Sequence, residues 1–175
     1  MRLSLLLTGI GLAFTPAIVT AESRDEAAAE QAAHPEARPY DPALDATAAV
    51  DAALARAGER GTLALVVLGA NWCHDSRALA GWLATDRFRQ LTDDRFEVVY
   101  VNVGMPQTGD GYNLDIAARF GLDEMKNTPA LFVVSADGEV LNADSAASWR
   151  NAASRSEDEI FDELALLATT EIARD

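Results

Sequence analysis

Residues 63–68 form a short, unbroken apolar run, LALVVL, and this run constrains the fold more than any other feature of the chain. Its length and its two valines are typical of a strand that is buried on both faces, as in a parallel sheet. Gly69-Ala70-Asn71 ends the run, and a helical pattern begins near Cys73 and continues to Leu83. A buried strand that leads directly into a helix predicts an α/β fold.

The flanking segments alternate between the same two patterns. A helix is expected over 44–57, with Gly58 as its stop, and a strand over 96–103. Thr85 and Asp86 can cap a short helix, and a further helix is expected from Leu114 to a stop at Gly121. Short strands are expected over 131–134 and 139–141, joined by the turn Asp137-Gly138. A final helix is expected from Glu157 to about Ala173. Strand–helix–strand units imply parallel pairing, and the closing hairpin implies antiparallel pairing. We therefore predict a mixed central β-sheet flanked by helices on both faces.

The first 21 residues predict an export signal. Arg2 precedes a mostly apolar stretch over 3–19, and Val19-Thr20-Ala21 offers small residues to a signal peptidase. The alternative is a retained membrane anchor, but the apolar stretch lies at the short end of the ~17–25 residues that span a bilayer. We therefore expect cleavage after Ala21 and a periplasmic or secreted protein without stable membrane insertion.

Residues 22–43 are rich in Ala, Glu and Pro, and their prolines interrupt any helix. This composition predicts a flexible linker, followed by one folded domain over 44–175. His34 falls in the linker, where a solvated histidine is expected rather than a metal ligand.

Charge and cysteine content exclude several classes of partner and site. The net charge is −14 at pH 7, and such a field repels nucleic acid and anionic lipid surfaces. Cys73 is the single cysteine, which excludes an internal disulfide and a multi-cysteine zinc site. A lone thiol in an oxidising compartment is unusual, because it can be capped or can cross-link two chains.

Cys73 is expected where the buried strand gives way to a helix. Unpaired backbone N–H groups and the helix dipole favour an anion there, and the thiolate is the nucleophilic form of cysteine. Ser76 can donate a hydrogen bond to the sulfur. Asp75 opposes a nearby thiolate, whereas a protonated His74 favours it, so the direction of the net effect stays open. No metal or organic cofactor is predicted.

In these residues the chain resembles the thioredoxin superfamily. The matching pieces, which span about residues 60–142, are the strand over 63–68, Ala70-Asn71-Trp72-Cys73, Val101-Asn102-Val103, Thr128-Pro129 and the Asp137-Gly138 turn. The resemblance implies a thioredoxin-like fold in which Pro129 is cis and faces Cys73. It also implies that Thr128 offers backbone hydrogen bonds to an extended substrate and that Trp72 borders the site.

Two departures from the family pattern affect the predicted chemistry. Ser76 replaces the resolving cysteine, which makes a monothiol CxxS motif, and Val67 stands where many members carry a buried acid. A monothiol can form a mixed disulfide with a substrate but cannot release it by internal attack. Net reduction or oxidation therefore needs an outside thiol, whereas isomerisation does not.

The sequence thus predicts monothiol thiol–disulfide exchange through Cys73, as an oxidoreductase or isomerase, on envelope proteins that carry thiols or disulfides. Glutathione is a candidate co-substrate. One alternative is a redox-silent module that binds extended peptide segments of a partner protein. Another is a structural role in which Cys73 joins two chains. The substrate, the electron donor, the resting state of the thiol and the oligomeric state stay open.

Processing of the leader is directly testable. We expect the mature chain to begin at Glu22, because signal peptidase reads the small residues that end at Ala21. N-terminal sequencing of the protein from an envelope fraction checks this. Recovery of Met1 in a membrane fraction would contradict it and favour the anchor.

Overall fold

The computed structural model describes residues 34–169, at whose centre lies a three-stranded sheet in the order β2-β1-β5. In chain order the elements are α2 (Ala46–Arg60), β1 (Leu63–Gly69), α3 (His74–Leu83), α4 (Asp86–Arg95), β2 (Phe96–Asn102), β3 (Gly104–Met105), the 3₁₀ segment η1 (Pro106–Thr108), β4 (Asp110–Gly111), α5 (Leu114–Arg119), β5 (Ala130–Val134), the 3₁₀ segment η2 (Ser148–Ser154) and α6 (Glu157–Ala168). β1 pairs with β2 in parallel and with β5 antiparallel. The predicted mixed sheet is confirmed.

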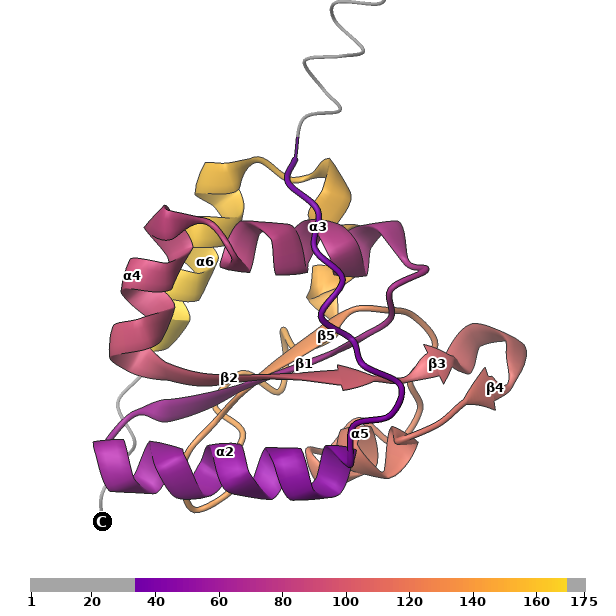
Figure 1. Ribbon diagram of the computed structural model, residues 1–175, viewed down its shortest axis with the longest axis horizontal. Helices are drawn as coiled ribbons and strands as arrows, with labels where there is room; N and C mark the ends of the chain where they lie inside the picture. The colour runs from indigo at the N-terminus through magenta and orange to yellow at the C-terminus, as the bar shows by residue number, and fades with distance from the viewer. Residues whose placement is uncertain (1–33, 170–175) are drawn as a thin grey trace, which may run out of the picture. The chain divides into compact units, whose positions relative to one another are not determined.

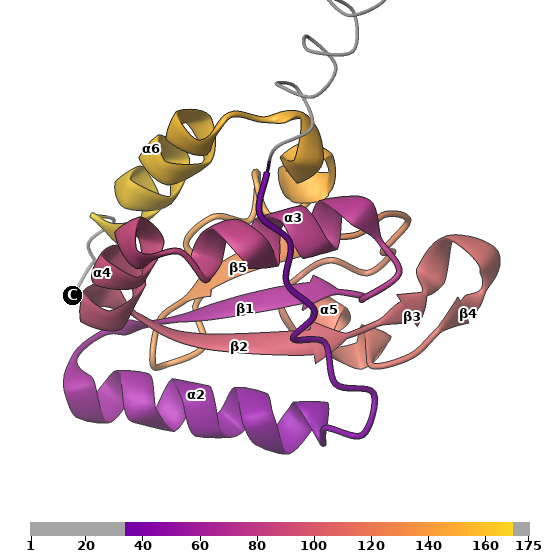
Figure 2. The same ribbon diagram turned by 45° about the horizontal axis from the view of Figure 1, so that its top comes forward.

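Every residue of β1 is buried, and its side chains alternate between two apolar cores. Leu63, Leu65 and Val67 pack with residues of α3, α4 and α6. The residues between them pack with α2 and α5. Helices therefore cover both faces of the sheet, as expected (Figures 1 and 2). Among residues 34–169, no helix is long and apolar enough to cross a membrane.

The helix α2 continues through Gly58, where the sequence predicted its end. It stops instead at Gly61, whose φ of 68° is the left-handed conformation that favours glycine. The N–H of Gly61 donates to the carbonyl oxygen of Ala57 and so satisfies one of the last free carbonyls. The prediction of Gly58 as the stop was wrong. A glycine ends a helix where it adopts the left-handed conformation, as Gly61 does, and Gly58 is not among the glycines with positive φ.

The predicted second strand of the closing hairpin is reduced to a single bridge between Val134 and Val140. The turn itself is present, with Gly138 at a φ of 89°. Beyond it, the Asn142 side chain adds to the pairing, donating to the carbonyl oxygen of Leu131 at 2.9 Å and accepting from the N–H of Val133 at 2.8 Å. This side-chain amide thus supplements the backbone hydrogen bonds along β5, such as the one from the N–H of Leu141 to the carbonyl oxygen of Val133 at 2.9 Å.

Two further segments differ from the predicted pattern. The region over 104–111, expected as a loop, holds the small hairpin of β3 and β4. The 3₁₀ segment η2 was not predicted, and its Trp149 is fully buried. The last helix ends at Ala168, and residues 170–173 of the predicted helix lie outside the described residues.

Residues 34–43, which we call the strap, cross over α3 and pass the sheet to reach the start of α2 (Figures 1 and 2). The N–H of Ala37 donates to the carbonyl oxygen of Arg77 at 3.1 Å, and Tyr40 is fully buried. The prediction of a flexible linker over 22–43 was therefore wrong for 34–43. The prolines prevent a helix there, yet the extended chain docks through its other side chains. The predicted leader and residues 22–33 lie outside the described residues.

A glycine in α3 makes this docking possible. A Cβ atom at Gly81 would lie 2.1 Å from the carbonyl oxygen of Pro35, which is shorter than any real contact. The strap backbone can therefore approach α3 only because position 81 has no side chain.

Gly81→Ala should weaken the fold. Alanine in a helix interior normally stabilises by about 0.5–1 kcal/mol relative to glycine, whereas overpacking costs about 1–3 kcal/mol. Gly58→Ala is the matched control, since its added carbon would lie 3.4 Å from the Cβ of Ala136, an ordinary contact. Urea unfolding should show a lower free energy of unfolding for Gly81→Ala and a higher one for Gly58→Ala. A gain in both variants would mean that the strap is not docked in solution.

Candidate functional site

Cys73 is the N-cap residue of α3, in the turn that follows β1. Its backbone is extended, with φ −77° and ψ 125°, and its N–H donates to the carbonyl oxygen of Ala70 at 3.1 Å. The residue is mostly buried, with 8% of its surface exposed. The thiol therefore lies at the N-terminal end of α3, where free backbone N–H groups favour an anion, as the sequence predicted.

The peptide before β5 lies opposite this thiol. Leu68 of β1 pairs with Ala130 of β5, and this register places Thr128-Pro129 beside the turn that carries Cys73. The Sγ atom of Cys73 donates to the carbonyl oxygen of Thr128 at 3.4 Å, and the Thr128–Pro129 peptide bond is cis. This arrangement agrees with what the resemblance implied. The substrate-binding role of Thr128 and Pro129 stays a prediction.

Three exposed apolar side chains gather around Gly104, next to the site. Trp72 is 47% exposed, and its indole N–H donates to the carbonyl oxygen of Gly104 at 2.9 Å. Met105 and Tyr112 are 40% and 41% exposed, and a Cβ at Gly104 would lie 2.7 Å from the Tyr112 ring. We call Trp72, Met105 and Tyr112 the apolar rim.

Sequence reasoning identified Trp72 and missed the other two members of the rim. A signal was available: β1 and β2 are parallel, so the segments that follow their carboxyl ends meet at one edge of the sheet. The N–H of Val103 donates to the carbonyl oxygen of Gly69 at 3.0 Å and continues this pairing toward the hairpin.

Ser76 is fully buried, and its hydroxyl has no hydrogen-bond partner in the described part of the protein. It lies against Gly69, where an added Cβ would be 2.7 Å from both the Ser76 hydroxyl and the Tyr40 ring. The bond expected from Ser76 to the sulfur is thus not formed in this structure. Its role as a donor to the thiolate stays a prediction.

The two predicted modulators have partners away from the sulfur. Asp75 accepts a hydrogen bond from the N–H of Ala153 at 2.9 Å and so connects α3 with η2. His74 has an exposed side chain, and its Nε2 lies 3.4 Å from Oε1 of Glu36 in the strap. Neither contact tests the predicted influence of these residues on the thiol.

Tyr40 of the strap packs against the turn that carries Cys73. Its backbone exchanges two hydrogen bonds with the Asn71 side chain, at 3.2 and 2.9 Å, and accepts a third from Asn102 at 3.0 Å. Its hydroxyl donates to the carbonyl oxygen of Ser76 at 3.2 Å. Burial raises the pKa of Tyr40 well above its usual value, so the hydroxyl remains a donor. Sequence reasoning missed this residue because it fell in the expected linker.

Two arginines hold the carbonyl groups that precede the thiol. Arg77 donates to the carbonyl oxygen of Trp72 at 2.8 Å, and Arg38 donates to that of Asn71 at 2.8 Å. Arg77 also pairs with Glu36 at 2.9 Å, and the hydrogen bond from Arg77 lowers the pKa of Glu36. The strap and α3 thus fix the approach to Cys73 from both sides.

The side chains placed to share a metal ion, within the part of the chain that the structure describes, are His34, Glu36 and His74. Cys73 is not among them. His34 is half-buried, and its ring centroid lies 4.7 Å from that of His74. The expectation that His34 is a solvated linker residue was therefore wrong, because the strap is docked.

Comparison with known proteins gives two matches. A family model described as "Thioredoxin-like" matches residues 45–136. The crystal structure of a disulphide isomerase from Xylella fastidiosa Temecula1 is similar, with 35% sequence identity and a TM-score of 0.67. The similarity covers 75% of this chain and 97% of the isomerase chain. No curated protein matches the chain.

The unpartnered hydroxyl of Ser76 generates a prediction with two readouts. Burying a polar group without a partner costs about 1–3 kcal/mol in proteins, so Ser76→Ala should raise the free energy of unfolding by about 1 kcal/mol. If the hydroxyl also serves the thiolate, the same variant should alkylate more slowly at Cys73. Urea unfolding and iodoacetamide kinetics measure the two effects.

Ser156→Ala is the control for this serine. The Ser156 hydroxyl caps α6 in a capping box with Glu159, and loss of such a cap costs about 1 kcal/mol. Its alkylation rate should match that of the wild type. Destabilisation by Ser76→Ala would show that the hydroxyl has a partner in solution.

Proposed function

This chain belongs to the thioredoxin-like family, and from that premise we propose that it catalyses thiol–disulfide exchange with Cys73 as its nucleophile. The observation that carries the proposal is the thiol at the N-terminus of α3, with Sγ 3.4 Å from the carbonyl oxygen of Thr128. The similarity to a disulphide isomerase supports the same class of chemistry. Ser76 in place of a second cysteine makes the exchange monothiol.

The first step is attack of the Cys73 thiolate on one sulfur of a substrate disulfide. A bond forms between Cys73 and that sulfur, the substrate S–S bond breaks, and the other substrate sulfur leaves as a thiolate. Backbone N–H groups at the start of α3 stabilise the attacking anion. The Ser76 hydroxyl, which has no other partner in the described structure, is available as an additional donor to the sulfur.

The second step needs another thiol, because the chain has no resolving cysteine. In isomerisation, a second substrate thiolate attacks the mixed disulfide, forms a new substrate disulfide and releases Cys73 without net electron transfer. In reduction, glutathione attacks at Cys73 and releases the reduced substrate. A second glutathione then restores the Cys73 thiol and leaves as glutathione disulfide.

We propose that the substrate is an extended or partly unfolded protein segment that lies along Thr128-Pro129 and the apolar rim. Three exposed apolar side chains beside the thiol suit a substrate that exposes its own apolar residues. In this structure the Cys73 thiol donates a hydrogen bond to the carbonyl oxygen of Thr128. When Cys73 ionises it can no longer donate, and the Thr128 oxygen becomes free to accept a backbone N–H of the substrate.

We further propose that the protein acts in the periplasm or outside the cell. The leader that the sequence predicts over 1–21 and the similarity to a bacterial disulphide isomerase support this proposal. Disulfide chemistry is also favoured in such oxidising compartments.

The apolar rim also favours a second candidate, a redox-silent module that binds peptide segments of a partner protein. Binding would then use the same surface, and the thiol would play no part. The two candidates differ in one respect, namely whether function depends on the sulfur of Cys73.

Exchange activity separates the two candidates. In a glutathione redox buffer, the wild type should accelerate recovery of a scrambled disulfide protein, and Cys73→Ser should abolish that activity. Ser76→Cys should add turnover with a dithiol reductase system alone, because a second sulfur can then attack the mixed disulfide from within the chain. Regain of native enzymatic activity by the scrambled substrate measures the first effect, and reduction of insulin disulfides by the reductase system measures the second.

A rim variant serves as the matched control. Met105→Ser with Tyr112→Ser should slow exchange with the protein substrate several-fold and leave the rate with a small disulfide unchanged. If instead Cys73→Ser retains full partner binding and function while the rim variant loses both, the protein is a peptide-binding module.

A further inference from the structure

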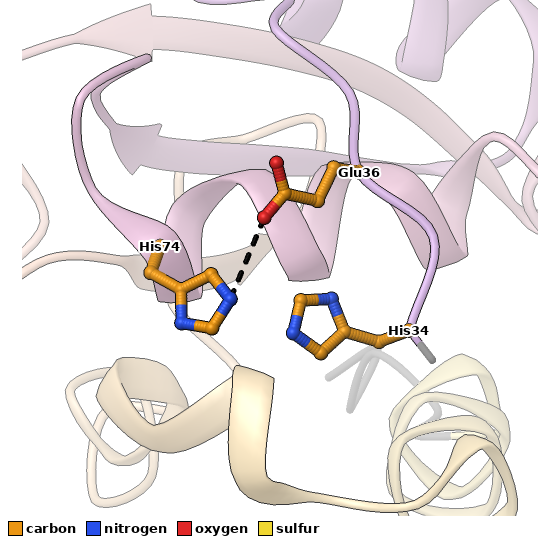
Figure 3. Close-up of side chains that lie close together, drawn as sticks. All are labelled: His34, Glu36 and His74. Atoms are coloured by element: carbon orange, nitrogen blue, oxygen red, sulfur yellow. Dashed lines mark ion pairs between the residues drawn. The ribbon is translucent and has the colours of Figure 1, made fainter. Parts of the chain in front are cut away.

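Both histidines of the chain, which are far apart in sequence, lie together where the strap passes the start of α3 (Figure 3). His74 is the first residue of α3, and His34 and Glu36 come from the strap. The ligand atoms of these three side chains all lie within 4.8 Å of one another. Proposed thiol–disulfide exchange uses none of them as a reacting group.

The spacing suits a small metal ion. Two ligands of a tetrahedral zinc ion, each bound at about 2.0–2.1 Å, lie about 3.3 Å apart. Nε2 of His74 and Oε1 of Glu36 are 3.4 Å apart, close to the separation expected for two ligands of one zinc ion. The tilted ring of His34 lies beside that of His74, as Figure 3 shows, and its nearest ligand atom lies within 4.8 Å of the other two.

The neighbours of the three side chains orient them as ligands. Nδ1 of His34 lies 3.4 Å from the carbonyl oxygen of Pro35, so a proton on Nδ1 leaves Nε2 free for a metal. Arg77 binds Oε2 of Glu36 at 2.9 Å and makes a longer contact of 3.3 Å with Oε1. A carboxylate has about four lone-pair sites on its two oxygens, so Oε1 can still bind a metal.

The site is open enough to exchange ions with solvent. The side chains of His74 and Glu36 are 60% and 37% exposed, and the chain carries a net charge of −14 that attracts cations. Two imidazoles and one carboxylate leave at least one coordination position for water, as in open zinc sites.

We infer that His34, Glu36 and His74 form a site for one divalent transition-metal ion of the zinc class. The nitrogen and oxygen ligands suit Zn²⁺, and Cu²⁺ binds such ligands still more tightly. The ion would join the strap to the start of α3 beside the turn that carries Cys73. This inference does not depend on the proposed exchange activity, because Cys73 is not a ligand.

The test is titration with Zn²⁺ of the full chain in a Cys73→Ser background, which removes the thiol as a competing ligand. Calorimetry should show one ion per chain, and Zn²⁺ should raise the melting temperature. His34→Ala and His74→Ala should each weaken Zn²⁺ binding by at least ~10–100-fold. Loss of a residue that only supports a metal ligand already costs this much, and these two residues are proposed as ligands themselves. Glu36→Gln should weaken binding less than the loss of a histidine.

Glu139→Gln, a change at an exposed carboxylate in the turn after β5, is the matched control and should bind Zn²⁺ like its parent. Circular dichroism without metal verifies that each variant is folded. Absence of saturable binding in the Cys73→Ser background would overturn the inference. So would a double variant, His34→Ala with His74→Ala, that binds Zn²⁺ as tightly as its parent.

Discussion

The pairing of β1 with both of its neighbours determines where Cys73, Thr128-Pro129 and the apolar rim lie relative to one another. Its parallel register with β2 brings the hairpin after β2 to the end of β1, and its antiparallel register with β5 brings Thr128-Pro129 to the same end. Cys73 follows β1 by a short turn and lies between them. Because β1 is buried on both faces, a one-residue shift would exchange its side chains between the two cores. Both cores would then be mispacked, so these positions are specified by packing.

Much of this arrangement follows from local patterns that a sequence displays. The apolar run over 63–68 predicts β1, and the helical pattern that follows it predicts that Cys73 lies at the start of a helix. Other parts depend on contacts between distant segments. Prolines in the strap predict an interrupted helix, but only the space over Gly69 and Gly81 allows Tyr40 and Pro35 to dock.

Side chains that supplement backbone pairing were equally hard to predict from the sequence. The amide of Asn142 makes two hydrogen bonds to the backbone of β5, and nothing in its local pattern distinguishes it from a loop asparagine. Likewise, His34 and His74 meet only because the strap crosses over α3. Local patterns therefore predicted the positions of Cys73 and Thr128-Pro129, whereas the part of the site supplied by the strap required the tertiary structure.

The environment of Ser76 bears on why a serine stands at this position. A sulfhydryl is a weak hydrogen-bond donor, so it loses little when it is buried without a partner, whereas a hydroxyl loses more. Ser76 is buried without a partner in the described structure, so stability alone would favour alanine or cysteine there. Natural proteins tend to keep such locally unfavourable residues at functional positions, where stability and activity are in conflict. Alanine would also lack a second sulfur, so the absence of a resolving cysteine does not by itself account for the serine. What distinguishes serine from alanine is the hydroxyl, which under the proposed mechanism can donate to the thiolate at the cost of some stability.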